Sequence, residues 1–472
     1  DYLRLEQKYT HLMKMDIASC FYHIYTHTIA WAVKGKEQAK DQIGKSTFEK
    51  DFDTLMQQTN YNETNGIVVG PEISRIFAEI ILQRIDVNVL NRLKQEPYSL
   101  KLGRDYEVRR YVDDHYIYTN SEENLRLILE VYKEELQFYK LYVNESKLEF
   151  LERPFVSNVS DAKREINNLI SDIYERWLLK DEGGKYKHAV KNEMKSFTSI
   201  VNNFRSITHR YNQKYGTLNR YFLTLLISQL GRESINEYAA DATAGLLLMY
   251  LEVAFYIFSL DMNASASIKM CRILNHLHKW AEKCTDKTIL PELENRIYRE
   301  VKRCLDIYES NRKNGEINLE VLNLMLCLSR MMKTPIPRKQ LVSLFNIAKS
   351  SAMEYEHLNY FQICTLLYII GGDAGYEDIR KNIVSEINRR LLVDCALWHA
   401  DNALLFFDVI VCPNIEKKEV KQIIRKVYNC SETAYANKYK ELTKTKRWFF
   451  NWDKTCSISE LLSKKEYHSP YE

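Results

Sequence analysis

Residues that form turns or interrupt helices are scarce in this chain: its 472 residues include only 14 glycines and 8 prolines. This scarcity favours long helices joined by short connections. Charged residues make up 28% and hydrophobic residues 45%, which is the composition of an ordinary globular protein and excludes a disordered one. A chain of this length has room for about two to four domains.

The sequence also has no C-x-x-C pair among its ten cysteines. Zinc sites and redox dithiols commonly use that spacing, so neither is predicted. We expect reduced, mostly buried thiols, as in a cytosolic protein. The net charge of +4 is small, and a nucleic-acid binder of this composition must gather its positive charge locally.

No signal peptide is visible, and long apolar runs are rare. The longest, Ala242–Leu260, has 19 residues and contains Glu252. A bilayer span needs about 20 apolar residues, and the central carboxylate and missing basic flank favour a buried helix instead. No membrane contact is predicted. The chain begins with Asp1 rather than methionine, and we expect that preceding sequence is missing.

Residues 1–158 combine strand-like and helix-like patterns and predict an α+β domain. The strand candidates are an alternating run that ends in an acid and two short strands that meet at an acidic turn. A helix that begins at a proline, a second helix and a further short run complete the pattern. In chain order these segments are His11–Asp16, Pro71–Asp86, Arg110–Thr119, Glu122–Phe138 and Tyr142–Phe150.

Residues 159–472 have helical periodicity almost throughout and predict an all-α domain. Examples are Tyr221–Leu230, Gly245–Leu260, Leu319–Met332, Phe361–Ile370 and Ile383–Cys395. Helical blocks about 35–50 residues apart are typical of HEAT- or TPR-like repeats. No repeating residue signature accompanies the spacing, so the prediction is an irregular, HEAT-like helical repeat.

Three aspartates carry the strongest chemical signal. Asp16 ends the first predicted strand, and Asp113 and Asp114 form the acidic turn of the strand pair. Polymerases of the two-metal type use carboxylates from adjacent strands to hold two Mg²⁺ ions about 3.5–4 Å apart. An isolated Asp-Asp pair is usually only a solvated turn, so the interpretation depends on the neighbouring motifs.

Four segments, in order, resemble the palm motifs A to D of reverse transcriptases. They are MDIASCFYHIYTH (Met15–His27), NGIVVGPEISRIFAEIIL (Asn65–Leu82), RRYVDDHYIY (Arg109–Tyr118) and LYVNESKLEF (Leu141–Phe150). Together with the IAWAVKGKEQAK segment, they are similar to bacterial defence-associated reverse transcriptases of the abortive-infection, AbiK-like type. In those enzymes a palm leads into a helical repeat domain. The motifs cover about residues 10–155.

The resemblance implies that Asp16, Ile17, Asp113 and Asp114 surround two Mg²⁺ ions, for which Mn²⁺ is a possible substitute. It places Phe21 beneath the sugar of the incoming nucleotide, where a bulky ring excludes a ribose 2′-hydroxyl and selects dNTPs. Phe21 is alternatively a core aromatic.

The resemblance also implies roles for further residues of these motifs. Gly70 lets the backbone approach the incoming base pair, and Ser74 and Arg75 at the following helix start contact nucleic acid. Lys147 protonates or neutralises the leaving pyrophosphate, or is simply a solvated lysine. Val68 and Val69 replace the proline and polar residue usual in motif B, which puts template contacts in doubt. The finger motifs before motif A are largely absent, and no thumb is recognisable after motif D.

Two features outside the motifs have alternative interpretations. Lys438–Trp452 interleaves basic and aromatic residues, including Lys446, Arg447 and Trp448. This suits single-stranded nucleic acid, or aromatic packing of a C-terminal segment on the helical domain. The histidines that flank the acidic motifs, His23, His27 and His115, are expected to be hydrogen-bonded structural residues rather than metal ligands.

The predicted function is a reverse-transcriptase-type DNA polymerase of bacterial antiviral defence, located in the cytoplasm. Its expected partners are dNTPs, an RNA template or non-coding RNA, the DNA product, and further copies of the chain in a homo-oligomer. Priming by protein or RNA and synthesis without a template are both open, as is a covalent protein–DNA product. One alternative is a catalytically silent palm that acts as an RNA-binding or assembly scaffold. Another is a metal-dependent nuclease, which would have no use for Phe21 as a sugar gate.

Overall fold

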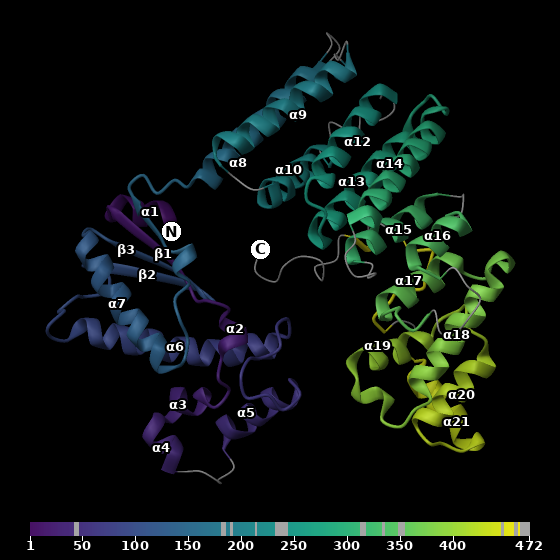
Figure 1. The fold of residues 1–472 in the computed structure, drawn as a ribbon. Helices are drawn as coiled ribbons and strands as arrows, with labels where there is room; N and C mark the ends of the chain where they lie inside the picture. The colour runs from purple at the N-terminus through teal and green to yellow at the C-terminus, as the bar shows by residue number, and fades with distance from the viewer. Residues whose placement is uncertain are drawn as a thin grey trace. The chain divides into compact units, whose positions relative to one another are not determined.

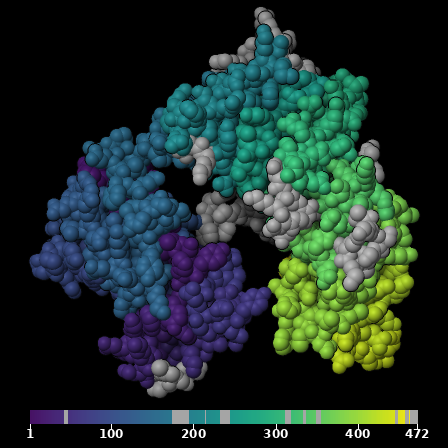
Figure 2. Space-filling view, in the orientation of Figure 1, coloured from purple at the N-terminus to yellow at the C-terminus, as the bar shows by residue number. Residues whose placement is uncertain are grey.

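The computed structural model divides into two compact units, Asp1–Ser157 and Asn158–Glu472 (Figure 1). Figure 2 draws the surface of the first unit in purple to blue and that of the second in teal to yellow. The division falls one residue before the boundary expected from the sequence, and the assignment of two domains stays a prediction. The structure describes residues 1–41, 47–180, 186–188, 192–212, 215–231, 244–311, 318–332, 336–347, 355–444, 448–456 and 461–462.

The first unit is built on a four-stranded antiparallel sheet, which together with its helices confirms the α+β prediction for this region. The strand order is β2-β3-β1-β4, so β1 lies between β3 and β4. The strands are β1 (His11–Asp16), β2 (Tyr106–Tyr111), β3 (Asp114–Thr119) and β4 (Glu149–Glu152).

Successive side chains of each strand point to opposite faces of this sheet. Met13, Met15 and Ile117 point to one face and join a core with two long helices, α6 and α7. Leu12 and Tyr118 point to the other face and pack with α1. Asp16 therefore lies on the face opposite α6 and α7, because it alternates with Met15. The helices are α1 (Tyr2–Lys8), α6 (Glu72–Lys94) and α7 (Glu122–Phe138).

Helix α6 begins at the predicted proline but runs eight residues beyond the expected end. Pro71 is its N-cap, and the apolar spacing continues through Ile85, Val89 and Leu93, which are all buried. Two apolar residues near its start, Ile73 and Ile76, are nevertheless 40% and 45% exposed. The buried stripe instead contains Phe77, Ala78, Ile81 and Leu82.

Short helices connect β1 to α6. The peptide after β1 forms α2 (Cys20–His23), and three further helices follow: α3 (Thr28–Lys34), α4 (Lys36–Asp41) and α5 (Phe48–Gln58). Helix α3 packs against both α5 and α6. A single-turn helix, η1 (Glu145–Lys147), lies between α7 and β4.

The second unit is largely helical, as predicted, with one small hairpin of β5 (Leu178–Lys180) and β6 (Tyr186–His188) that the sequence did not indicate. Helices α10, α13, α15, α17 and α19 pack in succession, each against the next. Its helices are α8 (Asn158–Trp177), α9 (Glu193–Arg210), α10 (Tyr215–Leu230), α12 (Ala244–Ser259), α13 (Ala264–Lys283), α14 (Ile289–Asn311), α15 (Leu319–Met331), α16 (Arg338–Phe345), α17 (Tyr360–Ile370), α18 (Glu377–Leu391), α19 (Ala400–Val409), α20 (Lys417–Val427) and α21 (Glu432–Leu442).

The apolar run at residues 242–260 lies mostly in α12, a helix of 16 residues of which ten are buried. The prediction of a buried helix is confirmed. Among the residues that the structure describes, no helix has both the length and the apolar character needed to cross a membrane.

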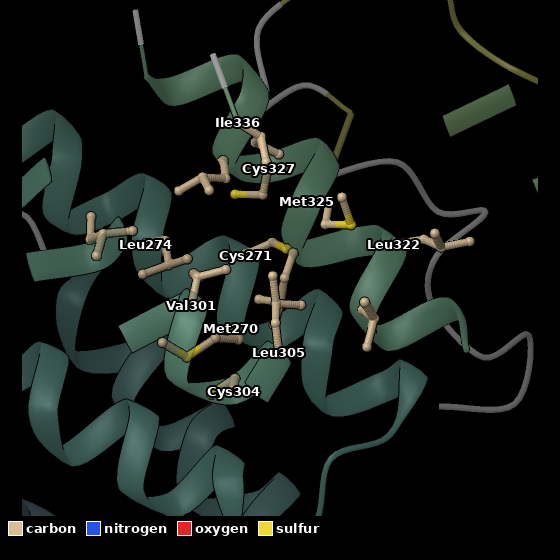
Figure 3. Packing of buried hydrophobic residues seen from close by; sticks show 14 of the residues in the cluster. Met270, Cys271, Leu274, Val301, Cys304, Leu305, Leu322, Met325, Cys327 and Ile336 are labelled. Atoms are coloured by element: carbon tan, nitrogen blue, oxygen red, sulfur yellow. The ribbon is translucent and has the colours of Figure 1, made fainter. Parts of the chain in front are cut away.

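All ten cysteines lie in the described part of the chain, and each is a free thiol, as predicted. Several gather with methionines in the core between α13, α14 and α15, where Figure 3 shows the sulfur atoms of Cys271, Cys304 and Cys327 among Leu274 and Val301. Burial raises the pKa of the Cys304 thiol to about 12. These thiols therefore act as small apolar side chains in the core.

A buried carboxylate, Asp408, binds the segment after α21 to the helical unit. The Tyr360 hydroxyl donates to Asp408 Oδ2, and the backbone N–H groups of Phe449 and Phe450 donate to Oδ1 at 3.0 and 2.9 Å. The Trp452 indole donates to the Asp408 carbonyl at 3.0 Å. These bonds supply the partners that a buried charge requires.

Replacing Asp408 with alanine is expected to destabilise the helical unit by about 3 kcal/mol, because a buried hydroxyl and two backbone N–H groups lose their acceptor. The measurement is the free energy of unfolding in urea, followed by circular dichroism. Asp394→Ala is the matched control, since that side chain is 95% exposed and has one ion pair, to Lys426 at 3.5 Å. Its effect should stay within about 0.5 kcal/mol. Equal stabilities of the two variants would show that Asp408 is not an anchor.

Candidate active site

Asp16 is the last residue of β1, and the backbone turns sharply just beyond it. Ile17 pairs with Val143, Ala18 donates to the Tyr142 carbonyl at 2.8 Å, and Ser19 has a left-handed φ of 44° before α2 begins. Asp16 itself is only 7% exposed. The central strand thus delivers one carboxylate to a nearly buried position at the end of the sheet.

The β2–β3 hairpin brings the other two aspartates to the same place. Asp114 is directly opposite Asp16 in the antiparallel register, and Asp113 lies in the turn just before it. Directly opposed residues have Cβ atoms about 4.5–5.5 Å apart. The structure therefore brings together the three carboxylates that the sequence singled out.

Burial and nearby like charges change the pKa values of two of these carboxyl groups. Burial and the charges of Asp16 and Asp114 raise the pKa of Asp113. Burial and the charge of Asp16 raise the pKa of Asp114. Like charges in one partly buried site favour the protonated form of each carboxyl group. A cation bound among these carboxylates would favour their ionised forms.

Lys147 supplies a cation within the chain. Its Nζ lies 2.9 Å from Asp16 Oδ2, and Asn144 Nδ2 donates to the same oxygen at 3.1 Å. The hydrogen bond and charge of Asp16 raise the pKa of Lys147. The Asn144 N–H also donates to the Asp16 carbonyl at 2.8 Å. Asn144, which the sequence did not single out, thus fixes both the backbone and the side chain of Asp16.

A cavity of about 310 Å³ opens beside these groups. Its lining is polar and charged, and comprises Lys14, Met15, Asp16, Asp114, His115, Tyr116, Ser146, Lys147 and Glu149. Asp16, Asp114 and Tyr116 share the sheet face opposite α6 and α7, as the strand alternation requires.

The chemistry of the aspartates fits a magnesium-type ion, which prefers carboxylate oxygens. Within the described residues, however, no group of three or more histidine, cysteine, aspartate or glutamate side chains is arranged to hold a metal ion as the side chains stand. The ammonium group of Lys147 already contacts Asp16 Oδ2 at 2.9 Å. A metal ion held by that oxygen would have to compete with Lys147.

Phe21 and Ile17 lie beside the acidic groups. Phe21 is half-buried in α2 and packs against the core of the first unit, and its carbonyl accepts the Ile67 N–H at 2.8 Å. Ile17 is 1% exposed. The core-aromatic interpretation of Phe21 thus has structural support, while its half-exposure leaves part of the ring free to contact a sugar.

The motif B residues have different environments. Gly70 is exposed with a φ of 120°, and nothing lies within 4 Å of the position that a Cβ would take. Ser74 is 1% exposed and faces the core, so the structure does not place it at a nucleic-acid surface. Arg75 is half-buried and pairs with Glu72, its Nε lying 2.9 Å from Oε1.

Gly66 is a close-contact position that the sequence interpretation overlooked. Its φ is 84°, and a Cβ there would lie 3.0 Å from the Tyr22 carbonyl oxygen. Gly66 also donates to the Ile24 carbonyl at 2.8 Å. The Asn-Gly dipeptide at 65–66 is a turn signal that indicated such a position. Only glycine allows the motif B loop to pack this closely on α2.

Each of the flanking histidines forms a hydrogen bond within the protein, as predicted, and their exclusion as metal ligands stays a prediction. His23 Nδ1 is 3.1 Å from the Ala18 carbonyl, and His27 Nδ1 is 2.5 Å from Asp53 Oδ2. His115 Nδ1 is 3.1 Å from the Asp113 carbonyl, and the ring is only 2% exposed.

The C-terminal aromatic segment has its own partners in the helical unit. The Trp448 ring lies 4.5 Å from that of Phe407, and its Nε1 donates to the Leu442 carbonyl at 3.2 Å. These contacts support the packing alternative, and a role of Trp448 at nucleic acid stays a prediction. Lys446 and Arg447 lie outside the described residues.

Asp113→Asn is expected to stabilise the first unit at pH 7 when no metal is present. The pKa of Asp113 is raised in the folded state, so its ionisation favours unfolding and the destabilisation appears as the pH rises through that raised pKa. The melting temperature in EDTA should increase by about 2 °C at pH 7. Below the ordinary aspartate pKa of about 3.9 both states are protonated and the gain should vanish. Asp41→Asn, at an exposed position, is the control, and a lower melting temperature for Asp113→Asn at pH 7 would refute the repulsion.

The first unit is similar to a known protein family. Residues 1–198 match the family model described as reverse transcriptase (RNA-dependent DNA polymerase). The match covers the whole first unit, α8 and the beginning of α9. A search of curated proteins found no match. The matched region contains the sheet, the three aspartates and Lys147, and we conclude that residues 1–198 form a reverse transcriptase domain.

Proposed function

We propose that this chain is a DNA polymerase that extends DNA from dNTPs with two Mg²⁺ ions at Asp16, Asp113 and Asp114. The family's description is RNA-dependent DNA polymerase, and reverse transcriptases generally use a divalent metal. The observation that carries the proposal is the register of β1 and β3, which sets Asp16 opposite Asp114 and next to the turn that contains Asp113. A site without catalysis has no need to gather carboxylates that repel one another.

The residues around the aspartates would each have a separate role in nucleotide addition. When bound, the divalent ions would activate a 3′-hydroxyl and neutralise the pyrophosphate. Asp16, Asp113 and Asp114 would hold these ions, with the region of Ile17 beside them. Once released from Asp16, Lys147 has a proton to give to the leaving pyrophosphate. Phe21 would stand beneath the sugar, and Gly70 would let the backbone approach the incoming base pair.

The finer features of the proposal come from the resemblance to abortive-infection reverse transcriptases. We include among them a role in bacterial antiviral defence, priming by protein or RNA, and assembly into a homo-oligomer. The helical unit would take the place of a thumb as an irregular, HEAT-like repeat. The succession of packed helices from α10 to α19 supports this assignment.

One observation favours the second candidate function, a catalytically silent scaffold that binds RNA. Lys147 already neutralises Asp16, and a site that never receives a metal would keep that ion pair permanently. The two candidates differ in whether the protein incorporates nucleotides.

Purified protein incubated with the four dNTPs and Mg²⁺, with and without an RNA template and primer, is expected to make DNA. Asp113→Asn should lower the rate at least about 100-fold, because the variant loses a carboxylate that balances the metal charge. Asp41→Asn should retain the parent rate. Sequencing the product and testing for its covalent attachment to protein establish template use and priming. Equal product from the parent and Asp113→Asn would refute catalysis at this site, and no product from either protein would favour the scaffold.

Phe21→Ala is expected to increase incorporation of rNTPs relative to dNTPs on the order of 10–100-fold, since the smaller side chain leaves room for a 2′-hydroxyl. The measurement compares kcat/KM for a dNTP and the matching rNTP. Tyr22→Ala is the control, because the neighbouring Tyr22 ring is 66% exposed. Unchanged sugar selection in Phe21→Ala would remove the ring from the nucleotide site and leave the core interpretation.

A further inference from the structure

The turn that carries the aspartates has a backbone conformation that its residues do not favour. Tyr111 pairs with Asp114, so Val112 and Asp113 form a two-residue loop. Val112 has a φ of 54°, and a β-branched residue rarely adopts the left-handed region. Such a conformation persists only where surrounding contacts enforce it.

Arg110 supplies one of those contacts from the strand just before the turn. Its Nη1 donates to the Val112 carbonyl at 2.9 Å. The same guanidinium forms a two-pronged pair with Glu79 of α6, at 2.9 and 2.7 Å, and its Nε donates to Asp86 at 2.6 Å. The Arg110 side chain is only 10% exposed. A planar fork with this many bonds has one orientation.

His115 supplies the second contact from the opposite strand. It is the cross-strand partner of Arg110, and its Nδ1 faces the Asp113 carbonyl at 3.1 Å. A carbonyl only accepts, so Nδ1 carries the hydrogen. His115 Nε2 lies 3.7 Å from Asp86 Oδ1, and the Tyr132 hydroxyl of α7 donates to the same oxygen at 3.4 Å.

Both loop carbonyls are therefore held by side chains that converge on Asp86. From these contacts we infer that Arg110 and His115 are positioning residues, which fix the Val112-Asp113 loop to α6 and thereby set the geometry of Asp113 and Asp114. The inference rests on the proposed polymerase function. It adds Glu79 and Asp86, on the opposite side of the sheet from the cavity, to the residues on which metal binding depends.

Arg109, the residue before Arg110 in β2, lies on the opposite face of the strand and has a different environment. Arg109 points away from α6, its side chain is 46% exposed, and it pairs with Glu107 and Asp1. An exposed ion pair of this kind contributes little to stability or orientation. Arg109 and Arg110 thus offer a matched comparison of the same residue type at adjacent positions.

The test compares Arg110→Met with Arg109→Met in two assays. In steady-state polymerisation, Arg110→Met should lower kcat on the order of 100-fold and leave the KM for dNTP within about threefold, because the loop carries metal ligands rather than nucleotide contacts. Its affinity for Mn²⁺, measured by electron paramagnetic resonance without substrate, should fall about tenfold. Arg110→Lys should give intermediate values, because an ammonium group reaches a carboxylate without the fork. Arg109→Met should match the parent.

His115→Asn provides an independent variant where Arg110→Met does not fold. It should also lower the affinity for Mn²⁺. Where Arg110→Met does fold, the loss of Mn²⁺ affinity in the double variant should be smaller than the product of the two single losses, since both residues act through Asp86. Folded variants with the kcat and Mn²⁺ affinity of Arg109→Met would overturn the inference. A parent protein that binds Mn²⁺ but makes no DNA would instead refute the polymerase proposal and leave the positioning role supported by the affinity differences.

Discussion

Repulsion among three carboxylates is the constraint on which the first unit is organised. Burial and the charge of Asp16 raise the pKa of both Asp113 and Asp114, and the fold must hold these groups together against the repulsion. It does so with backbone register, because β1 is paired on both sides and cannot shift without breaking two ladders. A one-residue slip would turn Asp16 to the opposite face of the sheet. The register therefore fixes the distance between charges that would otherwise separate.

The antiparallel order of the strands also explains why residues far apart in sequence act together. Because β1 lies between β3 and β4, Asp16 has the aspartate hairpin on one side and the segment with Asn144 and Lys147 on the other. The carboxylates of the hairpin lie on one side of Asp16, and the amide of Asn144 and the ammonium group of Lys147 lie on the other. The central strand thus receives both the repulsive and the compensating partners of its terminal carboxylate.

Local sequence patterns indicated the main strands and long helices of the first unit and its acidic residues. The strand at His11–Asp16 and the helix after Pro71 follow from residue periodicity and from a proline at the helix start, both of which are local. The orientation of α6 was not predictable in the same way, since Ile73 and Ile76 have the apolar spacing of a buried face and yet are exposed. Burial depends on which neighbours cover a helix, and those neighbours come from distant segments.

The site residues that the sequence missed are those whose role depends on a distant partner. Asn144 is an ordinary loop asparagine until β1 places Asp16 beside it, and Arg110 resembles Arg109 until the strand alternation directs one of them to α6. Among the residues assigned by motif, Ser74 shows the converse. The motif resemblance assigned it to nucleic acid, but the helix turns its side chain into the core. Sequence order gives the motif, and tertiary packing decides which of its side chains reaches the site.

The two cations near the aspartates differ in a way that suits different tasks. Lys147 lies on the cavity side, its side chain is 64% exposed, and a flexible ammonium group there can exchange Asp16 for water or phosphate at small cost. Arg110 lies on the helix side, is nearly buried, and would deprive the partly buried Glu79 and Asp86 of their guanidinium partner if it moved. Under the proposed function, the exposed cation would yield its place to a metal ion. The nearly buried cation would instead preserve the shape of the loop, as the positioning role that we infer for Arg110 requires.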